Sequence, residues 1–335
     1  MTHRADWRGG RIRRRDFVLV AGSVVIDSSL AVGAQQPGQM QRIGFLRAAP
    51  APERELDAFL RDLADGGYVQ GRNFTLIPQW GDGNVARLPE LAVALINAGA
   101  DVIVAEGTIV ARAAAAVTTT TPIVMVGVAD PLAGGFVKNL SHPGGNVTGF
   151  SSLDTDIAGK LIEILNEMIP GLRHVGILAT RAIWYLFASA QDRAAKALGI
   201  ELSYVDMPEP AAAGTAMREA IAAGAQAAVV RGGPFFSAMQ RRFIIDKAAE
   251  FRLPVIYERR DDTARGGLVS YSADHIQLYR AAARYVARIL RGERAADLPV
   301  QQPSKFEFVI NLKTAKALGL DVSASLLARA DEVIE

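Results

Sequence analysis

The chain has 335 residues, of which 50% are hydrophobic and 21% are charged, so its composition is that of a globular protein and not of a disordered one. It contains no cysteine, which excludes disulfides, thiolate metal sites, a thiol nucleophile and a lipid-modified N-terminal cysteine. Its formal net charge is only +2, and its length suits two lobes of roughly 120–150 residues each.

The first 34 residues have the order of segments that is typical of a bacterial export signal. Arg14 and Arg15 form a twin-arginine pattern before Phe17, an apolar run covers 17–26, and small residues at 32–34 suit a cleavage site. The alternative is a membrane anchor, but the run is shorter than the about 20 apolar residues that a span needs. We therefore expect a periplasmic protein with a twin-arginine-like signal that is not a lipoprotein.

The basic charge belongs to this N-terminal segment. The chain has 37 basic and 35 acidic residues, and residues 1–34 hold six of the basic and three of the acidic ones. The remainder therefore has 31 basic and 32 acidic residues, a net charge of −1. Nothing in this charge indicates nucleic acid as a partner.

Strands and helices alternate along the first half of the mature chain. Apolar runs predict strands over 42–46, 73–79, 101–105 and 123–128. Amphipathic or alanine-rich patterns predict helices over 53–64, 88–98 and 111–117. This alternation predicts βαβ units and a parallel sheet.

The stretch 123–151 predicts a crossing from one lobe to another. Its strand stops at Asp130, glycines and prolines follow, and residues 147–150 have the pattern of a strand again. A strand that ends in glycine and proline and resumes without a full helix is typical of a passage between lobes. A second candidate crossing follows at 266–272.

The second half of the chain repeats the scheme of the first. Strands are predicted over 174–178, 201–206, 227–230, 255–257 and 306–310. Helices are predicted over 157–169, 188–198, 216–223, 241–251, 276–290 and 312–318. Residues 98–104 and 223–229 have matching patterns, which indicates duplication of a whole lobe. We predict an export signal over 1–34, lobe one over 41–149 plus 273–335, and lobe two over 150–272.

Catalysis, metal binding and nucleotide binding have little support in the sequence. There is no G-x-S-x-G elbow, and no G-x-G-x-x-G or Walker pattern follows a strand. His142, His174 and His275 lack metal-ligand spacing. We therefore expect no cofactor, no metal and no catalytic residue.

The site that remains is a cleft between two lobes, because ligands of open α/β sheets bind beyond the carboxyl ends of the strands. Hydroxyls and backbone amides there would orient polar groups, and aromatic rings would stack on the ligand or, alternatively, pack helices onto the sheets. The arginines at strand ends, Arg47, Arg181 and Arg231, would supply a charged partner or be solvated. The predicted ligand-binding residues are Thr108, Asp130, Ser151, Trp184, Gly233, Phe235, Tyr257 and Tyr271.

Residues 298–319, LPVQQPSKFEFVINLKTAKALG, closely resemble the C-terminal signature of a periplasmic binding-protein family. This family is the substrate-binding component of ABC transporters related to the tryptophan-binding type. Residues 326–335, 143–149 and 266–271 resemble the same family, and the similarity runs from about residue 42 to the end of the chain.

The resemblance implies a type I periplasmic-binding fold, in which two Rossmann-like lobes with parallel sheets are joined by three crossing strands. It also implies an ABC permease and its ATPase as partners, but it does not fix the ligand. The chain departs from its relatives at 106–108, 132–133 and 182–185. We interpret these departures as changes in ligand specificity.

Together these observations predict the solute-binding component of an ABC importer and no enzyme. It would capture an aromatic or apolar amino acid, or an aromatic carboxylate, between its lobes by hinge closure. The alternatives are a periplasmic ligand sensor for a signalling receptor, and a two-lobed α/β enzyme such as a racemase. The absence of cysteine removes the two-thiol form of a racemase.

Overall fold

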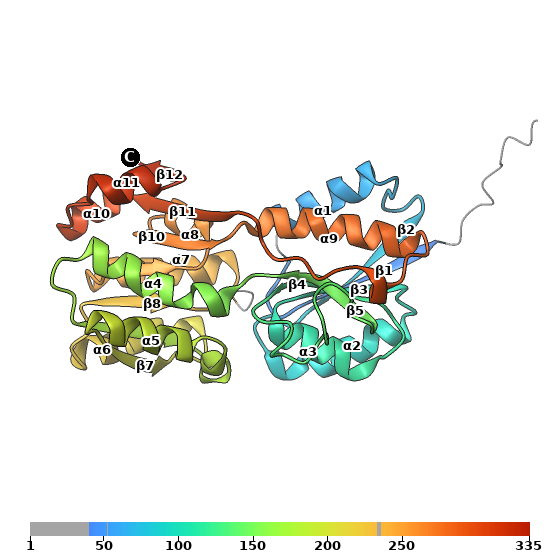
Figure 1. The fold of residues 1–335 in the computed structure, drawn as a ribbon, viewed down its shortest axis with the longest axis horizontal. Coiled ribbons are helices and arrows are strands. Elements are labelled where there is room, and N and C mark those ends of the chain that lie inside the picture. The colour runs from blue at the N-terminus through green and yellow to red at the C-terminus, as the bar shows by residue number, and fades with distance from the viewer. Residues whose placement is uncertain (1–39, 52, 233–235) are drawn as a thin grey trace, which may run out of the picture. The chain divides into compact units, whose positions relative to one another are not determined.

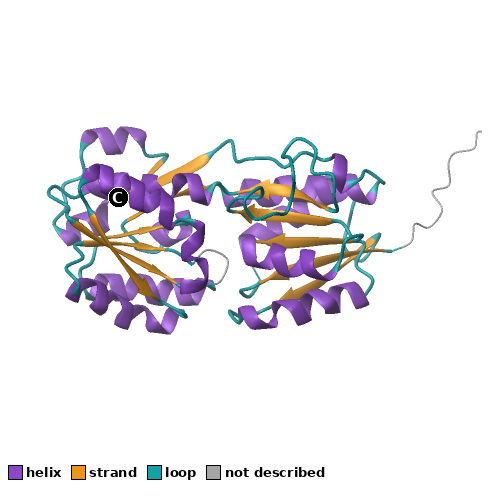
Figure 2. Ribbon diagram, turned by 60° about the horizontal axis from the view of Figure 1, so that its bottom comes forward, coloured by secondary structure: helices purple, strands orange, loops and turns teal. Residues whose placement is uncertain are grey.

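Two mostly parallel β-sheets with helices on both faces make up the described part of the chain (Figures 1 and 2). The computed structural model describes residues 40–51, 53–232 and 236–335. The two sheets confirm the predicted α/β class with two lobes of largely parallel strands. The expected export signal over 1–34 lies outside the described residues.

The first sheet has five parallel strands in the order β2-β1-β3-β4-β5. They are β1 (Gln41–Arg47), β2 (Phe74–Trp80), β3 (Val102–Glu106), β4 (Ile123–Val128) and β5 (Val147–Ser151). Its helices are α1 (Glu53–Asp65), α2 (Leu88–Asn97), α3 (Thr108–Val117) and α9 (His275–Leu290). We call this sheet and its four helices the first lobe.

Both faces of the first sheet are buried, which explains why its inner strands are apolar over most of their length. Helices α1 and α9 lie on one face, and α2 and α3 lie on the other (Figure 1). On the first face, the ring of Phe45 lies 5.7 Å from that of Phe59 and 6.0 Å from that of Tyr279. These edge and stacked contacts join the helices α1 and α9 to strand β1.

The second sheet has seven strands in the order β12-β11-β10-β9-β8-β6-β7, with β10 and β11 antiparallel. The strands are β6 (His174–Ala179), β7 (Glu201–Asp206), β8 (Ala227–Val230), β9 (Val255–Tyr257), β10 (Val269–Ala273), β11 (Phe306–Asn311) and β12 (Glu332–Ile334). The helices are α4 (Asp154–Met168), α5 (Ala188–Leu198), α6 (Ala213–Ala222), α7 (Ala238–Glu250), α8 (Arg260–Ala264), α10 (Leu312–Leu318) and α11 (Ala324–Arg329). We call this sheet and its helices the second lobe.

The C-terminal tail divides between the two lobes, whereas we predicted that all of 273–335 belongs with the first. Helix α9 contacts β3, β4 and β5 of the first sheet. Strands β11 and β12, in contrast, continue the second sheet beyond β10. Phe308 and Ile310 are buried in the second-lobe core, and this burial holds β11 there. The chain therefore passes between the lobes after β5, after β10 and before β11.

Helices α3 and α4 each begin three residues before the helices that the sequence predicted, which started at 111 and 157. The first turn of α4 is polar, with Asp154, Thr155 and Asp156, and that of α3 has the β-branched residues Thr108, Ile109 and Val110, which are weaker helix formers than alanine. The short elements α8, α11 and β12 were not predicted, because each spans too few residues to show a period.

Helix α7 begins with a capping box, which supports a first stability prediction. The Gln240 backbone N–H donates to Ser237 Oγ (3.2 Å), and the Ser237 N–H donates to Gln240 Oε1 (2.8 Å). We expect Ser237→Ala to lower the free energy of unfolding by about 1 kcal/mol, because it removes this cap. Urea-induced unfolding checks the value. The exposed Ser141→Ala should change it by less than about 0.5 kcal/mol, and equal effects of both variants would contradict the assignment.

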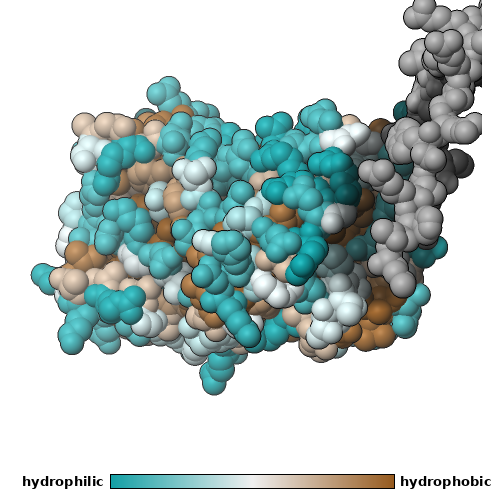
Figure 3. All heavy atoms as spheres, turned by 45° about the vertical axis from the view of Figure 1, so that its right-hand side comes forward, coloured by the Kyte–Doolittle hydropathy of each residue, from teal (hydrophilic) through white to brown (hydrophobic). Residues whose placement is uncertain are grey.

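The face of the molecule in Figure 3 is mainly hydrophilic, with hydrophobic side chains gathered in small separate areas. Among the residues that the structure describes, every helix is too short or too polar to cross a bilayer. The apolar residues are instead collected in the cores on the two faces of each sheet.

Candidate functional site

A pocket lies where strand ends of the two lobes face each other. It has about 440 Å³ of space that no atom fills, including the open solvent at its mouth. Its lining residues are Gly107, Thr108, Ile109, Gly127, Ala129, Asp154, Ile183, Leu186, Phe187, Arg231 and Glu258. We call it the inter-lobe pocket.

The first lobe contributes the N-terminus of α3 to the inter-lobe pocket. Gly107 precedes the helix with φ of 86°, a conformation that favours glycine, and no side chain caps the helix. The Ala129 N–H donates to Thr108 Oγ1 (3.1 Å), which ties the start of α3 to the end of β4. An uncapped helix N-terminus offers N–H donors and a positive dipole end, so it suits an anionic group.

The second lobe contributes a buried ion pair at the ends of β8 and β9. Arg231 Nη2 lies 2.8 Å from a carboxylate oxygen of Glu258, and the Gly232 N–H donates to the other oxygen (3.0 Å). The Arg231 guanidinium lies over the Phe187 ring, 4.3 Å from its centroid. These contacts hold the arginine in one orientation at the pocket wall.

The first crossing places Asp154 at the pocket, as the first residue of α4. Leu153, just before it, has φ of 56°, a left-handed conformation that is unusual for leucine. Burial raises the pKa of Asp154 to about 6, repulsion by Glu258 adds to this rise, and the Arg231 guanidinium opposes it. A cationic group of a ligand would relieve both the burial cost and the repulsion.

Apolar side chains complete the inter-lobe pocket. Ile109 enters from the first lobe, and Ile183, Leu186 and Phe187 enter from the second. Ile109 also lines a larger adjoining pocket of about 920 Å³, which includes residues of the loops after β2 and β7. The site thus combines donors, a carboxyl group and an apolar wall, and a second hollow extends from it.

A family model described as ABC transporter substrate binding protein matches residues 48–334. The chain belongs to this family. This confirms the resemblance seen in the C-terminal sequence.

The chain is also similar to a named relative and to solved structures of the same fold. The substrate-binding protein is 26% identical over 274 residues to a tyrosine-binding protein of Clostridioides difficile (strain R20291), covering 81% of this chain and 78% of the relative. It is 26% identical to a conserved domain protein from Vibrio cholerae, with a TM-score of 0.80 over 88% of this chain and 100% of that one. An ABC domain from Streptococcus in complex with L-Trp has 23% identity and a TM-score of 0.77, with the same coverage.

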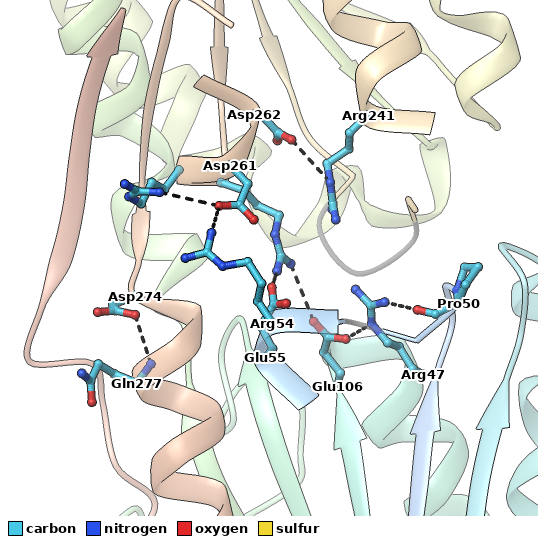
Figure 4. Close-up of polar contacts among 12 residues, drawn as sticks. Arg47, Pro50, Arg54, Glu55, Glu106, Arg241, Asp261, Asp262, Asp274 and Gln277 are labelled. Carbon is cyan, nitrogen blue, oxygen red and sulfur yellow. Dashed lines mark hydrogen bonds and ion pairs between the residues drawn. The ribbon is translucent and has the colours of Figure 1, made fainter. Parts of the chain in front are cut away.

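Beside the pocket, the substrate-binding protein has a buried cluster of ion pairs that joins the two lobes (Figure 4). In the first lobe, Arg47 at the end of β1 pairs with Glu106 at the end of β3. Arg259 of the second lobe pairs with Glu55 of α1, and its Nη1 lies 3.8 Å from Glu106 Oε1. All four side chains are at least 89% buried.

Two further pairs surround this cluster. Arg241 Nε lies 3.4 Å from Asp262 Oδ1 within the second lobe. At the exposed margin, Arg54 of the first lobe pairs with Asp261 of the second at 2.5 Å. Burial raises the pKa of Asp262 to about 6, although Arg241 and Arg259 oppose the rise. The lobes are therefore joined by charges that do not line the inter-lobe pocket.

Of the predicted ligand-binding residues, Thr108 lines the inter-lobe pocket. Ser151 is fully buried at the end of β5, close in sequence to Asp154. Asp130 Oδ1 accepts hydrogen bonds from the backbone of Leu132 and Ala133, so it shapes its own turn. Gly233 and Phe235 lie outside the described residues.

The three predicted aromatic residues in the described part of the second lobe have packing contacts of their own. Trp184 Nε1 donates to the Ala179 carbonyl (3.1 Å), and Arg181 covers its ring at 5.2 Å. Tyr257 is buried in the second-lobe core. Tyr271 is stacked on Phe306, with ring centroids 5.7 Å apart. The pocket lining does not include these three rings, and their roles in binding stay predictions.

Sequence reasoning missed three lining residues with clear chemistry. Asp154 carried no distinctive signal, because acidic residues are common in first helical turns. Phe187 and Leu186 follow the strand β6 by several residues, so strand ends alone did not point to them. Their presence next to the predicted Trp184 segment was the available signal.

Proposed function

We propose that this substrate-binding protein is the solute-binding component of an ABC importer and works outside the cytoplasm with a permease and its ATPase. Its ligand would be an aromatic or other apolar amino acid, or an aromatic carboxylate, captured by hinge closure. The observation that carries the proposal is the inter-lobe pocket, which both lobes line with polar and apolar groups.

The pocket has complementary partners for each part of an amino acid. The N-terminus of α3 suits a carboxylate, and Asp154 suits an ammonium group. Ile183, Leu186 and Phe187 form an apolar wall for a side chain. Among the proposed ligands, this set favours an amino acid over a carboxylate that lacks the ammonium group.

The relatives support this ligand class. One curated relative carries the name tyrosine-binding protein, and a structure with the same fold holds L-Trp. The apolar wall of the inter-lobe pocket, with Ile183, Leu186 and Phe187, suits the side chains of such ligands.

Hinge closure would couple binding to a change of conformation. A ligand that contacts both lobes at once stabilises the closed arrangement by its differential affinity for that state. A micromolar dissociation constant corresponds to about −8 kcal/mol, which a few buried hydrogen bonds and an apolar side chain can supply.

A ligand panel on protein that has been unfolded, dialysed and refolded tests the proposal. We expect at least one of tryptophan, tyrosine, phenylalanine, leucine and an aromatic acid to raise the melting temperature and to bind by calorimetry in a one-to-one ratio. Chiral chromatography of the recovered ligand should show the enantiomer that was added. Binding only of sugars or of polar amino acids would contradict the proposed ligand class, and conversion of the ligand would indicate an enzyme.

A further inference from the structure

Arg231 has hydrogen-bond donors that no described group of the protein uses. It is 3% exposed, and one of its nitrogens pairs with Glu258. Its Nε and Nη1 atoms have no hydrogen-bond partner among the residues that the structure describes. Buried donors of a charged group are costly without an acceptor, and arginine lines the inter-lobe pocket. A ligand in this pocket is therefore the natural source of the missing acceptor.

The guanidinium of Arg231 is held before any ligand arrives. Phe187 lies under its plane at 4.3 Å, and Glu258 fixes one edge. A planar group held on one edge and one face presents its remaining N–H groups in a fixed direction. Little side-chain entropy is then lost when these groups bind an acceptor.

The other lobe offers donors to the same pocket. Helix α3 spans ten residues from Thr108, and its N-terminus has no side-chain cap. Gly107 and Thr108 line the inter-lobe pocket together with Arg231. Two sets of donors, one from each lobe, thus face one space that also holds the carboxyl groups of Asp154 and Glu258.

We propose that Arg231 and the first turn of α3 form one acid subsite, in which a single carboxylate of the ligand accepts hydrogen bonds from both lobes. This inference rests on the proposed function and deepens it, because it makes the acid group the part of the ligand that joins the lobes. A carboxylate has two oxygens with lone pairs on both sides, so it can accept from a helix N-terminus and from a guanidinium at once.

The neighbouring acidic groups limit the ligand to one acid group on this wall. Glu258 already occupies one nitrogen of Arg231, and Asp154 lines the same pocket. A second carboxylate would meet repulsion from both. The subsite therefore selects monocarboxylates and rejects the corresponding amides and decarboxylated amines.

Calorimetry with three matched probes tests the acid subsite. The first set of probes is tryptophan, its amide tryptophanamide and its decarboxylated amine tryptamine. Phenylalanine and leucine give two further sets, each with the acid, the amide and the amine. We expect the acid to bind at least about 30-fold more tightly than its amide, because the amide lacks the charge that strengthens both sets of hydrogen bonds. The amine should bind more weakly still.

A conservative variant assigns the effect to the arginine. Arg231→Lys keeps a cation beside Glu258 but removes the planar set of donors. It should weaken binding of the acid by about 10-fold to 100-fold and binding of the amide by less than about 3-fold. Arg218→Lys is the matched control, since Arg218 also lies over an aromatic ring, that of Phe251, but does not line the pocket. It should leave both affinities unchanged.

The outcomes separate this inference from the proposed function. Equal binding of acid and amide, or an equal loss of both in Arg231→Lys, would overturn the acid subsite and leave the proposed ligand class standing. A polar, non-aromatic acid that binds with the same dependence on Arg231 would keep the subsite and overturn the ligand class. Failure of every acid to bind would overturn both. If Arg231→Lys does not fold, the comparison of acid with amide on the unaltered protein decides.

Discussion

Arg259→Met is expected to weaken ligand binding by about 100-fold although Arg259 does not line the inter-lobe pocket. Arg259 links the lobes through Glu55 and Glu106, and all three side chains are buried. Its loss would leave Glu55 without its cation whenever the lobes meet. Removing one partner of a buried pair costs about 3–5 kcal/mol, and about 1.4 kcal/mol corresponds to tenfold in affinity.

The expected loss of affinity comes from less favourable closure of the lobes, and the contacts between ligand and pocket stay the same. If the lobes separate, the two carboxylates regain water, so the variant would favour an open arrangement. Calorimetry gives the affinity, and small-angle scattering gives the radius of gyration with and without ligand. We expect a larger radius in the ligand-free variant than in the unaltered protein.

Two control variants isolate the pairs between the lobes. Arg260→Met changes the neighbouring arginine, whose partners Glu332 (2.5 Å) and Asp261 (3.8 Å) both belong to the second lobe, so binding should be unchanged. The double variant Arg259→Met with Glu55→Met should recover part of the affinity, because Glu106 keeps its partner Arg47. Equal losses of ligand affinity in Arg259→Met and Arg260→Met would contradict a role of Arg259 in closure.

Asp154→Asn is expected to weaken binding of the amino acid by about 10-fold to 100-fold, because it removes the charged partner of the ligand ammonium. A carboxylate ligand without an ammonium group should instead bind more tightly to Asp154→Asn, since the variant removes a charge that repels it. Asp156→Asn is the matched control, because Asp156 lies in the same helical turn but is exposed. Calorimetry on both variants with the same ligand checks the prediction. Tighter binding in Asp154→Asn would contradict the ammonium assignment.

The pH dependence of ligand affinity gives a second test of the role of Asp154. With a pKa of about 6, Asp154 becomes protonated as the pH falls from 7 to 5, so affinity should fall about tenfold over this range. Asp154→Asn should remove most of this dependence, since Asp262, with a similar pKa, does not line the pocket. The folding stability of the ligand-free protein should depend on pH in the opposite direction. Because the pKa of Asp154 is raised in the folded state, its contribution to stability becomes smaller as the pH rises from 4 through 6.

The architecture could be predicted from the sequence because buried parallel strands are apolar on both faces. Runs such as Ile123–Val128 are distinctive for that reason. The division of the tail could not be predicted, because the pattern of β11 shows that it is a strand but not which sheet it joins. That choice depends on the burial of Phe308 and Ile310 among residues far away in sequence.

The site could be predicted only to the level of strand ends. Thr108 lines the pocket because α3 starts directly after β3, so its position follows from the topology. The aromatic residues were harder to assign, since burial favours their packing against the protein itself. Tyr257 is an example: it ends a strand but lies in the core. The direction of a side chain at a strand end depends on tertiary packing, which no local pattern records.

Native mass spectrometry of the protein purified without denaturation, recorded before and after ligand release in organic solvent, tests the central claim most directly. We predict the release of one small molecule per chain with the mass of an aromatic or apolar amino acid or of an aromatic acid. The same preparation of Asp154→Asn should carry less of it. Release of a sugar, a nucleotide or a polar metabolite in the same ratio would contradict the account, as would an empty protein that also binds no member of the ligand panel.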